Sequence, residues 1–259
     1  MDLGLTGRKA IVCASSRGLG KGCAMALARE GCEVVINGRD ETVLERTAEE
    51  VRAVASASVH VIAADVSSRD GQRALLDACP EPDILINNNG GPPRRDYTEL
   101  DRDAMIEGVV QNMVTPVELI QAVMPGMAER GFGRIVNITS LSVLMPIEGL
   151  DLSSAARAGL TAFLAGVCRT VAHRNVTVNA VLPGKMDTDR LRSGLQGSAK
   201  KAGKSVEEVA ASQRAAIPAQ RFGEADEFGA VCAFLCSTYA GYITGQNFVV
   251  DGGLYPSAF

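Results

Sequence analysis

The chain alternates short apolar runs with segments of helical hydrophobic spacing. The apolar runs are rich in β-branched residues and almost continuously hydrophobic, as expected for parallel strands covered on both faces. They predict strands at 9–14, 33–37, 58–63, 83–87, 134–139, 175–181 and 247–250. The segments between them predict helices near 19–30, 40–55, 68–79, 101–129, 152–173 and 225–237. This alternation predicts an α/β fold with one doubly wound, seven-stranded parallel sheet and helices on both faces.

The pattern holds along the chain without a linker, a charge block or an internal repeat, which predicts a single domain over residues 1–259. Only the segment 188–220 departs from it, being polar and rich in glycine and lysine before it turns helical. An insertion after a late strand of an α/β enzyme commonly forms a lid over the substrate. We expect such a lid at 188–220, with a mobile surface excursion as the alternative.

Composition excludes several classes of protein. The 259 residues carry 26 Lys+Arg and 30 Asp+Glu, giving a net charge of −4, which argues against a non-specific nucleic-acid or anionic-membrane surface. No apolar stretch approaches the ~20 residues of a membrane helix, and the first residues lack a secretory signal pattern. Seven scattered cysteines without a CxxC pair are typical of buried free thiols in a reducing compartment, and two histidines are too few for a metal site. We therefore expect a cytoplasmic protein with no bound metal.

The segment after the first strand has the residues of a dinucleotide phosphate loop. It comprises Ser15, Ser16, Arg17, Gly18, Leu19 and Gly20. Glycines there let the backbone approach a pyrophosphate, while the amides and dipole of the following helix hold its charge. Alone, the glycine pair is equally typical of a tight turn, but its position between first strand and first helix is the one a dinucleotide site requires.

The end of the second strand indicates which dinucleotide is bound. An NAD-selective site usually places a carboxylate here for the ribose 2′-hydroxyl, whereas this chain has Arg39. Asp40 follows one residue later, where it is expected to cap the next helix. The guanidinium groups of Arg17 and Arg39 are suited to clasping a 2′-phosphate. The sequence therefore favours NADP(H) over NAD(H).

A series of short motifs, in this order and spacing, resembles the short-chain dehydrogenase/reductase family, specifically its 3-oxoacyl-carrier-protein reductase type. The motifs are Arg17–Gly20, Asp65–Val66, Asn87–Gly90, Asn112, Gly133–Ile138, Ser140, Asn179–Ala180, Pro183–Gly184, Thr188, Thr244–Gln246 and Asp251–Gly253. The resemblance covers nearly the whole chain. It implies a Rossmann fold, NAD(P)H-dependent interconversion of a small-molecule carbonyl and an alcohol, and a homotetramer, or a dimer, built on helices 101–129 and 152–173.

The resemblance also implies roles for individual residues. Asp65 would contact the adenine amino group, and Thr188 the nicotinamide carboxamide. The remaining cofactor-binding positions would be Val66, Asn88, Asn89, Gly90, Pro183 and Gly184. The family's first loop glycine is replaced by Ala14, a conservative change that we expect to cost little.

Asn112 is singled out by its surroundings as well. Pro116, four residues later in the same predicted helix, has no N–H, so it cannot donate the usual helical hydrogen bond to the Asn112 carbonyl. An unpaired carbonyl near a pocket must bind water or a ligand. The resemblance implies that this carbonyl holds a water of a proton relay, and the alternative is a proline that only bends the helix.

The catalytic pattern of the family is altered in this chain. The family requires a serine, a tyrosine thirteen residues later and a lysine four residues after that. Ser140 is present, but the next two positions are Ser153 and Arg157, within a flanking sequence that fits the family. A serine hydroxyl is a far weaker acid than a phenol, and an arginine stabilises an oxyanion without relaying a proton. Positioned acid–base catalysis is typically worth about 10²–10⁴-fold.

Another proton donor is therefore needed if the protein is an enzyme. Lys185 directly follows Pro183–Gly184, and partial burial there would lower its pKa, although a solvated lysine is the alternative. Asp151, Ser154 and Tyr97 are weaker candidates, and Asp151 is expected to cap a helix.

Two hypotheses remain open. In the first, Ser140 and Arg157 polarise the substrate oxygen, Lys185 or a water on Asn112 supplies the proton, and Ser153 stands at the position of the family's tyrosine. In the second, the protein is a non-catalytic NADP(H)-binding sensor or the partner subunit of an active paralogue. The substrate itself is not disclosed, since the pair Arg94–Arg95 is typical either of an acidic-substrate contact or of a solvated surface.

Overall fold

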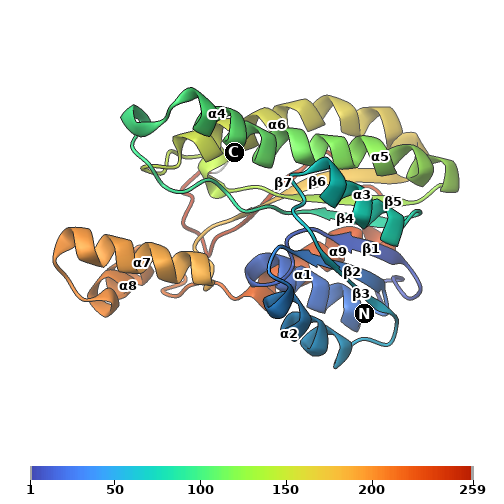
Figure 1. Ribbon diagram of the computed structural model, residues 1–259, viewed down its shortest axis with the longest axis horizontal. Coiled ribbons are helices and arrows are strands. Elements are labelled where there is room, and N and C mark those ends of the chain that lie inside the picture. The colour runs from blue at the N-terminus through green and yellow to red at the C-terminus, as the bar shows by residue number, and fades with distance from the viewer. Residues whose placement is uncertain (1, 258–259) are drawn as a thin grey trace.

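The computed structural model describes residues 2–257 and contains one seven-stranded sheet (Figure 1). All strands are parallel, in the spatial order β3-β2-β1-β4-β5-β6-β7. The strands are β1 Lys9–Val12, β2 Glu33–Gly38, β3 Val59–Ala63, β4 Ile84–Asn87, β5 Gly133–Ile138, β6 Val176–Pro183 and β7 Asn247–Val250. The predicted doubly wound sheet is confirmed, and each predicted strand end lies within two residues of the observed one.

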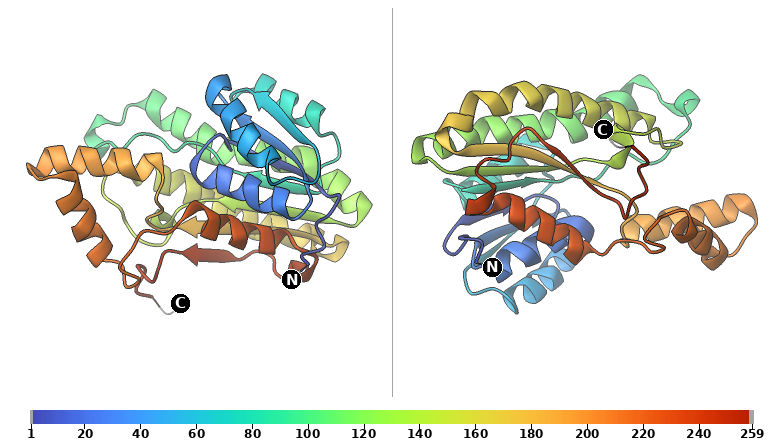
Figure 2. Two further views of the ribbon diagram at one scale, coloured as in Figure 1. Left: turned by 90° about the horizontal axis from the view of Figure 1, so that it is seen from below. Right: turned by 180° about the vertical axis from the view of Figure 1, so that it is seen from behind.

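Helices cover both faces of the sheet (Figures 1 and 2). One face packs against α1 Gly18–Arg29, α2 Glu41–Arg52 and α9 Ala225–Cys236. The other packs against α3 Arg69–Ala78, α5 Thr115–Arg130 and α6 Asp151–Val171. Alternate residues of each central strand enter opposite cores, as for Ile11 and Val12 of β1, which explains the continuous apolar runs. All seven cysteines are buried free thiols, as predicted, and no helix within residues 2–257 is long and apolar enough to cross a membrane.

The local sequence sets where the helices begin and end. The Asp40 carboxylate accepts a hydrogen bond from the Val43 amide at 3.1 Å, which confirms it as the cap of α2. Gly131 ends α5 in the left-handed conformation, at a φ of +71°. At α6, in contrast, the prediction was wrong: Asp151 is the first helical residue, and Leu150 stands at the cap position without a side-chain bond.

The predicted helix 101–129 is interrupted in the structure. It divides into α4 Arg102–Val109, a π-helical turn η2 Val110–Val114, and α5. In the π turn the Thr115 amide donates to the Val110 carbonyl, five residues back. Pro116 has no amide hydrogen to continue the α-helical pattern, and wide turns of this kind are frequent at functional sites. Asn112 lies in the middle of the turn and is buried.

The segment 188–220 folds into two helices, α7 Asp189–Ala202 and α8 Val206–Ala215, which project beyond the end of the sheet (Figures 1 and 2). The Thr188 hydroxyl caps α7 by accepting from the Leu191 amide, and Ser205 and Glu208 form a reciprocal capping box at α8. Gly203 joins the two helices with a φ of +62°. The segment is therefore an ordered helical pair.

The contact between α1 and α9 depends on backbone-to-backbone packing at Gly22. A Cβ at this position would lie 2.3 Å from the Ala225 carbonyl oxygen. We therefore expect Gly22→Ala to lower the free energy of unfolding by about 1–3 kcal/mol, because one of the two backbones must move. Gly197→Ala in α7, where a Cβ meets nothing within 4 Å, is the matched control and should raise stability by about 0.5–1 kcal/mol. Urea unfolding at one protein concentration measures both, and equal effects of the two substitutions would contradict the packing argument.

Candidate active site

The loops that follow β1, β4, β5 and β6 meet at the carboxyl edge of the sheet. β1 lies between β2 and β4, so the chain reverses its direction of travel across the sheet at this point. In doubly wound folds the crevice outside such a switch point is where ligands bind. Most of the residues singled out in the sequence lie in these loops or in the helices directly behind them, while Arg39 follows β2 and Asp65 and Val66 follow β3.

The phosphate loop is held by close backbone contacts. A Cβ at Gly20 would lie 2.4 Å from the Ala14 carbonyl oxygen, and the Asn88 side-chain amide donates to that oxygen at 3.0 Å. Ala14 itself has a φ of +44°, in the left-handed region that costs an L-residue about 1–2 kcal/mol. The replacement of the family's glycine therefore costs more than the sequence suggested.

Not every predicted loop residue presents its side chain to a ligand. Ser15 is fully buried, and its hydroxyl donates to the Val12 carbonyl at 2.7 Å, so its side chain shapes the loop. Ser16, Arg17 and Gly18, in contrast, line an open groove together with Lys21 and Arg46. The first turn of α1 carries no acidic residue, so its amides favour an anion, while the rest of the groove contains both these cations and the carboxylates of Glu50, Asp187, Asp189 and Asp226.

Arg17 and Arg39 lie in separate surroundings, and their joint clamp on a 2′-phosphate stays a prediction. Arg17 lies 3.8 Å from the Asp189 carboxylate in the phosphate-loop groove, whereas Arg39 lies 4.0 Å from Asp65 in a neighbouring hollow. Both pairs are solvent-exposed and therefore weak. The two arginines follow different strands. Of the two, only Arg39 lines the second hollow, which Asn89 and Gly90 also line.

The asparagine turn after β4 is tied down on several sides. The Asn89 amide donates to the Ser67 hydroxyl at 2.8 Å and to the Gln111 carbonyl at 3.1 Å. The Asn87 amide donates to the Asn137 side chain at 3.0 Å, which links β4 to β5. Val66 is buried at this edge, and a Cβ at Gly90 would meet nothing within 4 Å. The turn is thus rigid on the protein side and open on the other.

A cavity of about 280 Å³ brings the predicted catalytic residues together. Its walls include Ser140, Ser153, Arg157 and Lys185. The same cavity is lined by the residues that the resemblance places beside the nicotinamide, namely Pro183, Gly184 and Thr188. A Cβ at Gly184 would lie 2.5 Å from the Asp251 Cβ, so this wall requires glycine.

Ser153 and Arg157 on α6 are linked by a hydrogen bond, whereas Ser140 after β5 is held by its own turn. The Ser140 hydroxyl accepts from the Ser142 amide at 3.1 Å. Arg157 donates through Nε to the Ser153 hydroxyl at 3.2 Å and through Nη1 to the Ile138 carbonyl at 2.7 Å. Ser153 and Arg157 are one helical turn apart, and both are buried.

Arg157 carries a buried charge without a counter-ion. No carboxylate of the described residues lies within 4.0 Å of its guanidinium, since none of the described ion pairs includes it. Burial, followed by the positive charge of Arg190, lowers the pKa of Arg157 to about 10. The group therefore remains protonated at neutral pH and is placed to interact with negative charge on a bound molecule.

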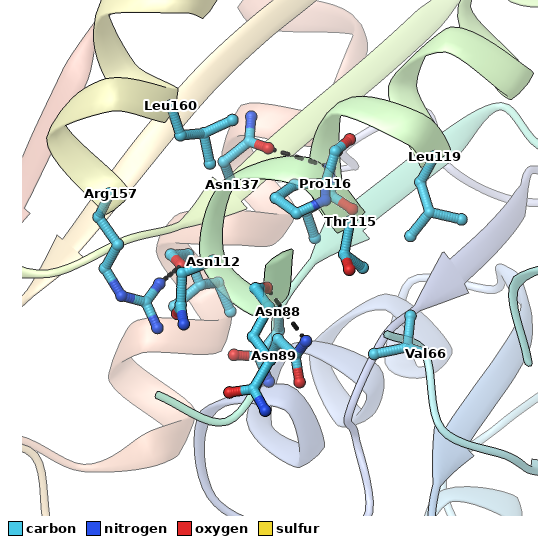
Figure 3. A pocket seen from close by; sticks show the side chains of 13 residues that line it. Val66, Asn88, Asn89, Asn112, Thr115, Pro116, Leu119, Asn137, Arg157 and Leu160 are labelled. Carbon is cyan, nitrogen blue, oxygen red and sulfur yellow. Dashed lines mark hydrogen bonds between the residues drawn. The ribbon is translucent and has the colours of Figure 1, made fainter. Parts of the chain in front are cut away.

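Asn112 adjoins a second, much smaller cavity of about 20 Å³, which Arg157 also lines (Figure 3). Its side-chain amide donates to the Gly108 carbonyl at 3.2 Å. Asn112 Oδ1 and Thr115 Oγ1 are buried without a hydrogen-bond partner in the protein. A cavity of this size holds about one water molecule, and such a water needs polar partners of this kind. The sequence drew attention to Asn112 but not to Thr115.

Of the candidate proton donors, only Lys185 reaches the larger cavity. It is half-buried, and desolvation together with the charge of Arg94 lowers its pKa. Tyr97 is 73% exposed and lies outside the cavity wall, and the Ser154 hydroxyl donates to the Leu150 carbonyl. The cavity wall also contains Arg190, which the sequence gave no reason to select.

A parallel doubly wound sheet with a glycine-containing phosphate loop and a polar cavity at its switch point defines a class, the dinucleotide-binding oxidoreductases. The chain belongs to the short-chain dehydrogenase/reductase family, as the resemblance implied. The family described as enoyl-(acyl carrier protein) reductase matches residues 13–255. The protein is an NAD(P)H-dependent oxidoreductase of this type, acting on a carbonyl or alcohol group.

Relatives match the chain over almost its full length. The 3-oxoacyl-[acyl-carrier-protein] reductase FabG of Pseudomonas aeruginosa is 33% identical over 263 residues, covering 98% of this chain and 100% of that protein. The NADPH-dependent reductase BacG of Bacillus subtilis is 32% identical over 251 residues, with 95% and 97% covered. Among solved structures, L-sorbose reductase from Gluconobacter frateurii, complexed with NADPH and L-sorbose, has a TM-score of 0.93 and 26% identity, with 99% and 100% covered.

Proposed function

We propose that the protein is an NADP(H)-dependent oxidoreductase that interconverts a carbonyl and an alcohol without the usual tyrosine and lysine. In this proposal Ser153 and Arg157 occupy the family's two catalytic positions. The observation that carries it is a single cavity lined by Ser140, Ser153, Arg157 and Lys185 next to the Pro183–Gly184 wall. A protein that retained only nucleotide binding would have no need to gather these groups around one open space.

The residues at the edge of the sheet fit the cofactor. The loop Ala14–Gly20 is folded so tightly that a Cβ at Gly20 would collide with the backbone of Ala14. The groove beside the loop contains Arg17, Lys21 and Arg46. This is the cradle that a diphosphate needs at a helix N-terminus. When bound, NADPH supplies the hydride for reduction. Asp65, Asn88, Asn89, Gly90 and Thr188 would then contact its adenosine and nicotinamide portions.

The protein groups would stabilise the oxygen of the substrate. Hydroxyl donors from Ser140 and Ser153, and the fixed charge of Arg157, are suited to a carbonyl oxygen that gains negative charge in the transition state. Arg157 does not release its proton at neutral pH, so Lys185 is the proton donor, helped by its lowered pKa. A water between Asn112 and Thr115 is the second source consistent with the buried, unpartnered oxygens.

Two further features support the proposal. Leu191, Leu195 and Ser198 of α7, with Gln213 of α8, form one wall of the cavity, so we propose that segment 188–220 is a substrate lid. Exposed apolar side chains gather on α4, the π turn and α6. They are Met105, Ile106, Val109, Val114 and Phe163, and they support a homotetramer built on these helices.

The alternative function is non-catalytic NADP(H) binding. It is favoured by one observation, which is that no tyrosine is among the residues that line the cavity within the described part of the chain. Direct turnover of any carbonyl compound would exclude it.

Cofactor choice is tested by calorimetry on the cofactor-free protein. We expect micromolar NADPH binding and NADH binding about 10–100-fold weaker, because a guanidinium bound to phosphate contributes about 1.5–3 kcal/mol. Arg39→Ala should remove most of this difference by weakening NADPH alone. The control is Arg52→Ala, at the last residue of α2, where the arginine is paired with Glu45. It should leave both affinities unchanged. Equal binding of the two nucleotides by the wild type would disprove the NADP(H) preference.

A further inference from the structure

The charged side chains that line the larger cavity are positive, whereas the protein as a whole has a negative net charge. Four of the residues that line it are cationic, and they are Arg94, Arg157, Lys185 and Arg190. Within the described residues, no aspartate or glutamate lines it. The complete chain has a net charge of −4, so this concentration of positive charge is not a consequence of overall composition.

The four cations act on one another electrostatically and have no carboxylate partner among the described residues. None of them takes part in an ion pair with a described residue. Desolvation, followed by the charge of Arg94, lowers the pKa of both Lys185 and Arg190. Such mutual repulsion destabilises the unliganded protein, and an anionic ligand would relieve it.

The position of Arg190 is fixed by contacts that leave its charge unneutralised. Its Nη1 donates to the Gly91 carbonyl at 3.1 Å and its Nη2 to the Pro92 carbonyl at 3.2 Å. These bonds tie α7 to the loop that carries Arg94. A Cβ at Gly91 would lie 2.9 Å from the guanidinium, so the loop is shaped around this side chain.

The phosphates of the cofactor have cations of their own. Arg17, Lys21 and Arg46 line the groove at the phosphate loop, and none of these three lines the larger cavity. The rest of the cavity wall is largely aliphatic, with Leu141, Ile147, Leu150, Leu195 and Leu254. This combination suits a molecule with an apolar body and a negatively charged end.

We propose that the substrate is a small organic acid, an oxo acid or the corresponding hydroxy acid. Its carboxylate would be bound by Arg94 and Arg190, and its reacting oxygen would lie at Ser140, Ser153 and Arg157, within reach of Lys185 as the proton donor. In reduction, the carbonyl carbon gains the hydride from NADPH and the oxygen gains one proton from Lys185, so the nicotinamide is oxidised as the alcohol forms. The assignment as a substrate rests on the proposed function, whereas the preference for an acid does not.

The test uses calorimetry on the NADP⁺-loaded protein and does not depend on turnover. The probes are three matched pairs: pyruvate, phenylpyruvate and 2-oxoglutarate, each against its methyl ester or diester. In at least one pair, we expect the acid to bind tenfold or more tightly than the ester. The carboxylate forms charge-assisted hydrogen bonds with the cations of the cavity, and the ester does not. The preference should disappear in Arg94→Gln, whereas Arg95→Gln, an adjacent arginine outside the cavity wall, should retain it.

Three results would overturn the inference. They are ester binding equal to acid binding in all three pairs, tighter binding of dihydroxyacetone phosphate than of every acid, and an Arg94→Gln variant that loses NADP⁺ affinity while keeping the acid preference. Oxidation of NADPH with each probe is followed separately by absorbance. Acid binding without NADPH oxidation would support the anion site and refute the proposed enzyme activity. Equal reduction of acid and ester would support the enzyme activity and refute the anion site.

Discussion

Arg157→Met is expected to lower turnover by about 10²–10³-fold and, at the same time, to make the protein more stable. The loss of turnover follows from removing the fixed charge that stabilises the substrate oxygen. Removing a single donor from an oxyanion site typically lowers turnover by this amount. The stability gain follows from burial: lowering the pKa of Arg157 to about 10 corresponds to a cost of about 3 kcal/mol for keeping it charged. Methionine fills a similar volume without a charge.

The stability gain is partly offset, since the Ile138 carbonyl and the Ser153 hydroxyl each lose a donor worth about 1 kcal/mol. A net increase of about 1–2 kcal/mol should appear in urea unfolding at pH 7. Arg157→Lys, which keeps a charge at the site, is the control and should give no such increase. A Met variant that is less stable than the wild type, with full turnover of a carbonyl compound, would refute the role of Arg157.

Installing a tyrosine and a lysine at the two positions proposed to be catalytic is expected to have the opposite effect on rate. We predict that Ser153→Tyr combined with Arg157→Lys raises carbonyl reduction, with the usual contribution of a positioned acid–base group, about 10²–10⁴-fold, as the upper limit because Lys185 already supplies a proton. The two positions lie one turn apart on α6, and the Ser153 hydroxyl is 3.2 Å from Arg157 Nε, so a phenol and an ammonium placed there would share the 280 Å³ cavity. The lysine would lower the pKa of the phenol.

Matched variants show whether the geometry is responsible. Ser153→Tyr alone should gain less, because a phenol beside Arg157 lacks the compact ammonium of the pair. Ser154→Tyr with Arg157→Lys places the phenol one residue away, outside the cavity wall, and should gain nothing. Steady-state rates of NADPH oxidation with one carbonyl substrate measure all three. A repaired enzyme no faster than the wild type would mean that the existing groups already supply the acid.

Particular residues show where sequence interpretation succeeded and where it failed. Asp40 was recognised as a helix cap and the seven strands were placed within two residues, because caps and hydrophobic runs are local properties. The uninterrupted helix 101–129 was wrong, since Pro116 acts together with the packing of its neighbours to produce a π turn. The separate surroundings of Arg17 and Arg39 were not foreseen, because side-chain direction after two different strands is set by the loops between them, and their joint clamp on a 2′-phosphate stays a prediction.

The sequence alone determined the doubly wound sheet, and it predicted a phosphate loop and placed Ser140, Ser153 and Arg157 as candidates for the family's catalytic positions. These depend on hydrophobic periodicity and on short motifs at fixed spacing, which are readable along the chain. Only the tertiary structure decided that Arg94, Arg157, Lys185 and Arg190 surround one cavity without a carboxylate among the described residues. The four residues come from four segments that lie up to 96 positions apart in the sequence. The carboxyl edge of the sheet and the helical pair α7–α8 bring their side chains together, and no local sequence pattern encodes this approach.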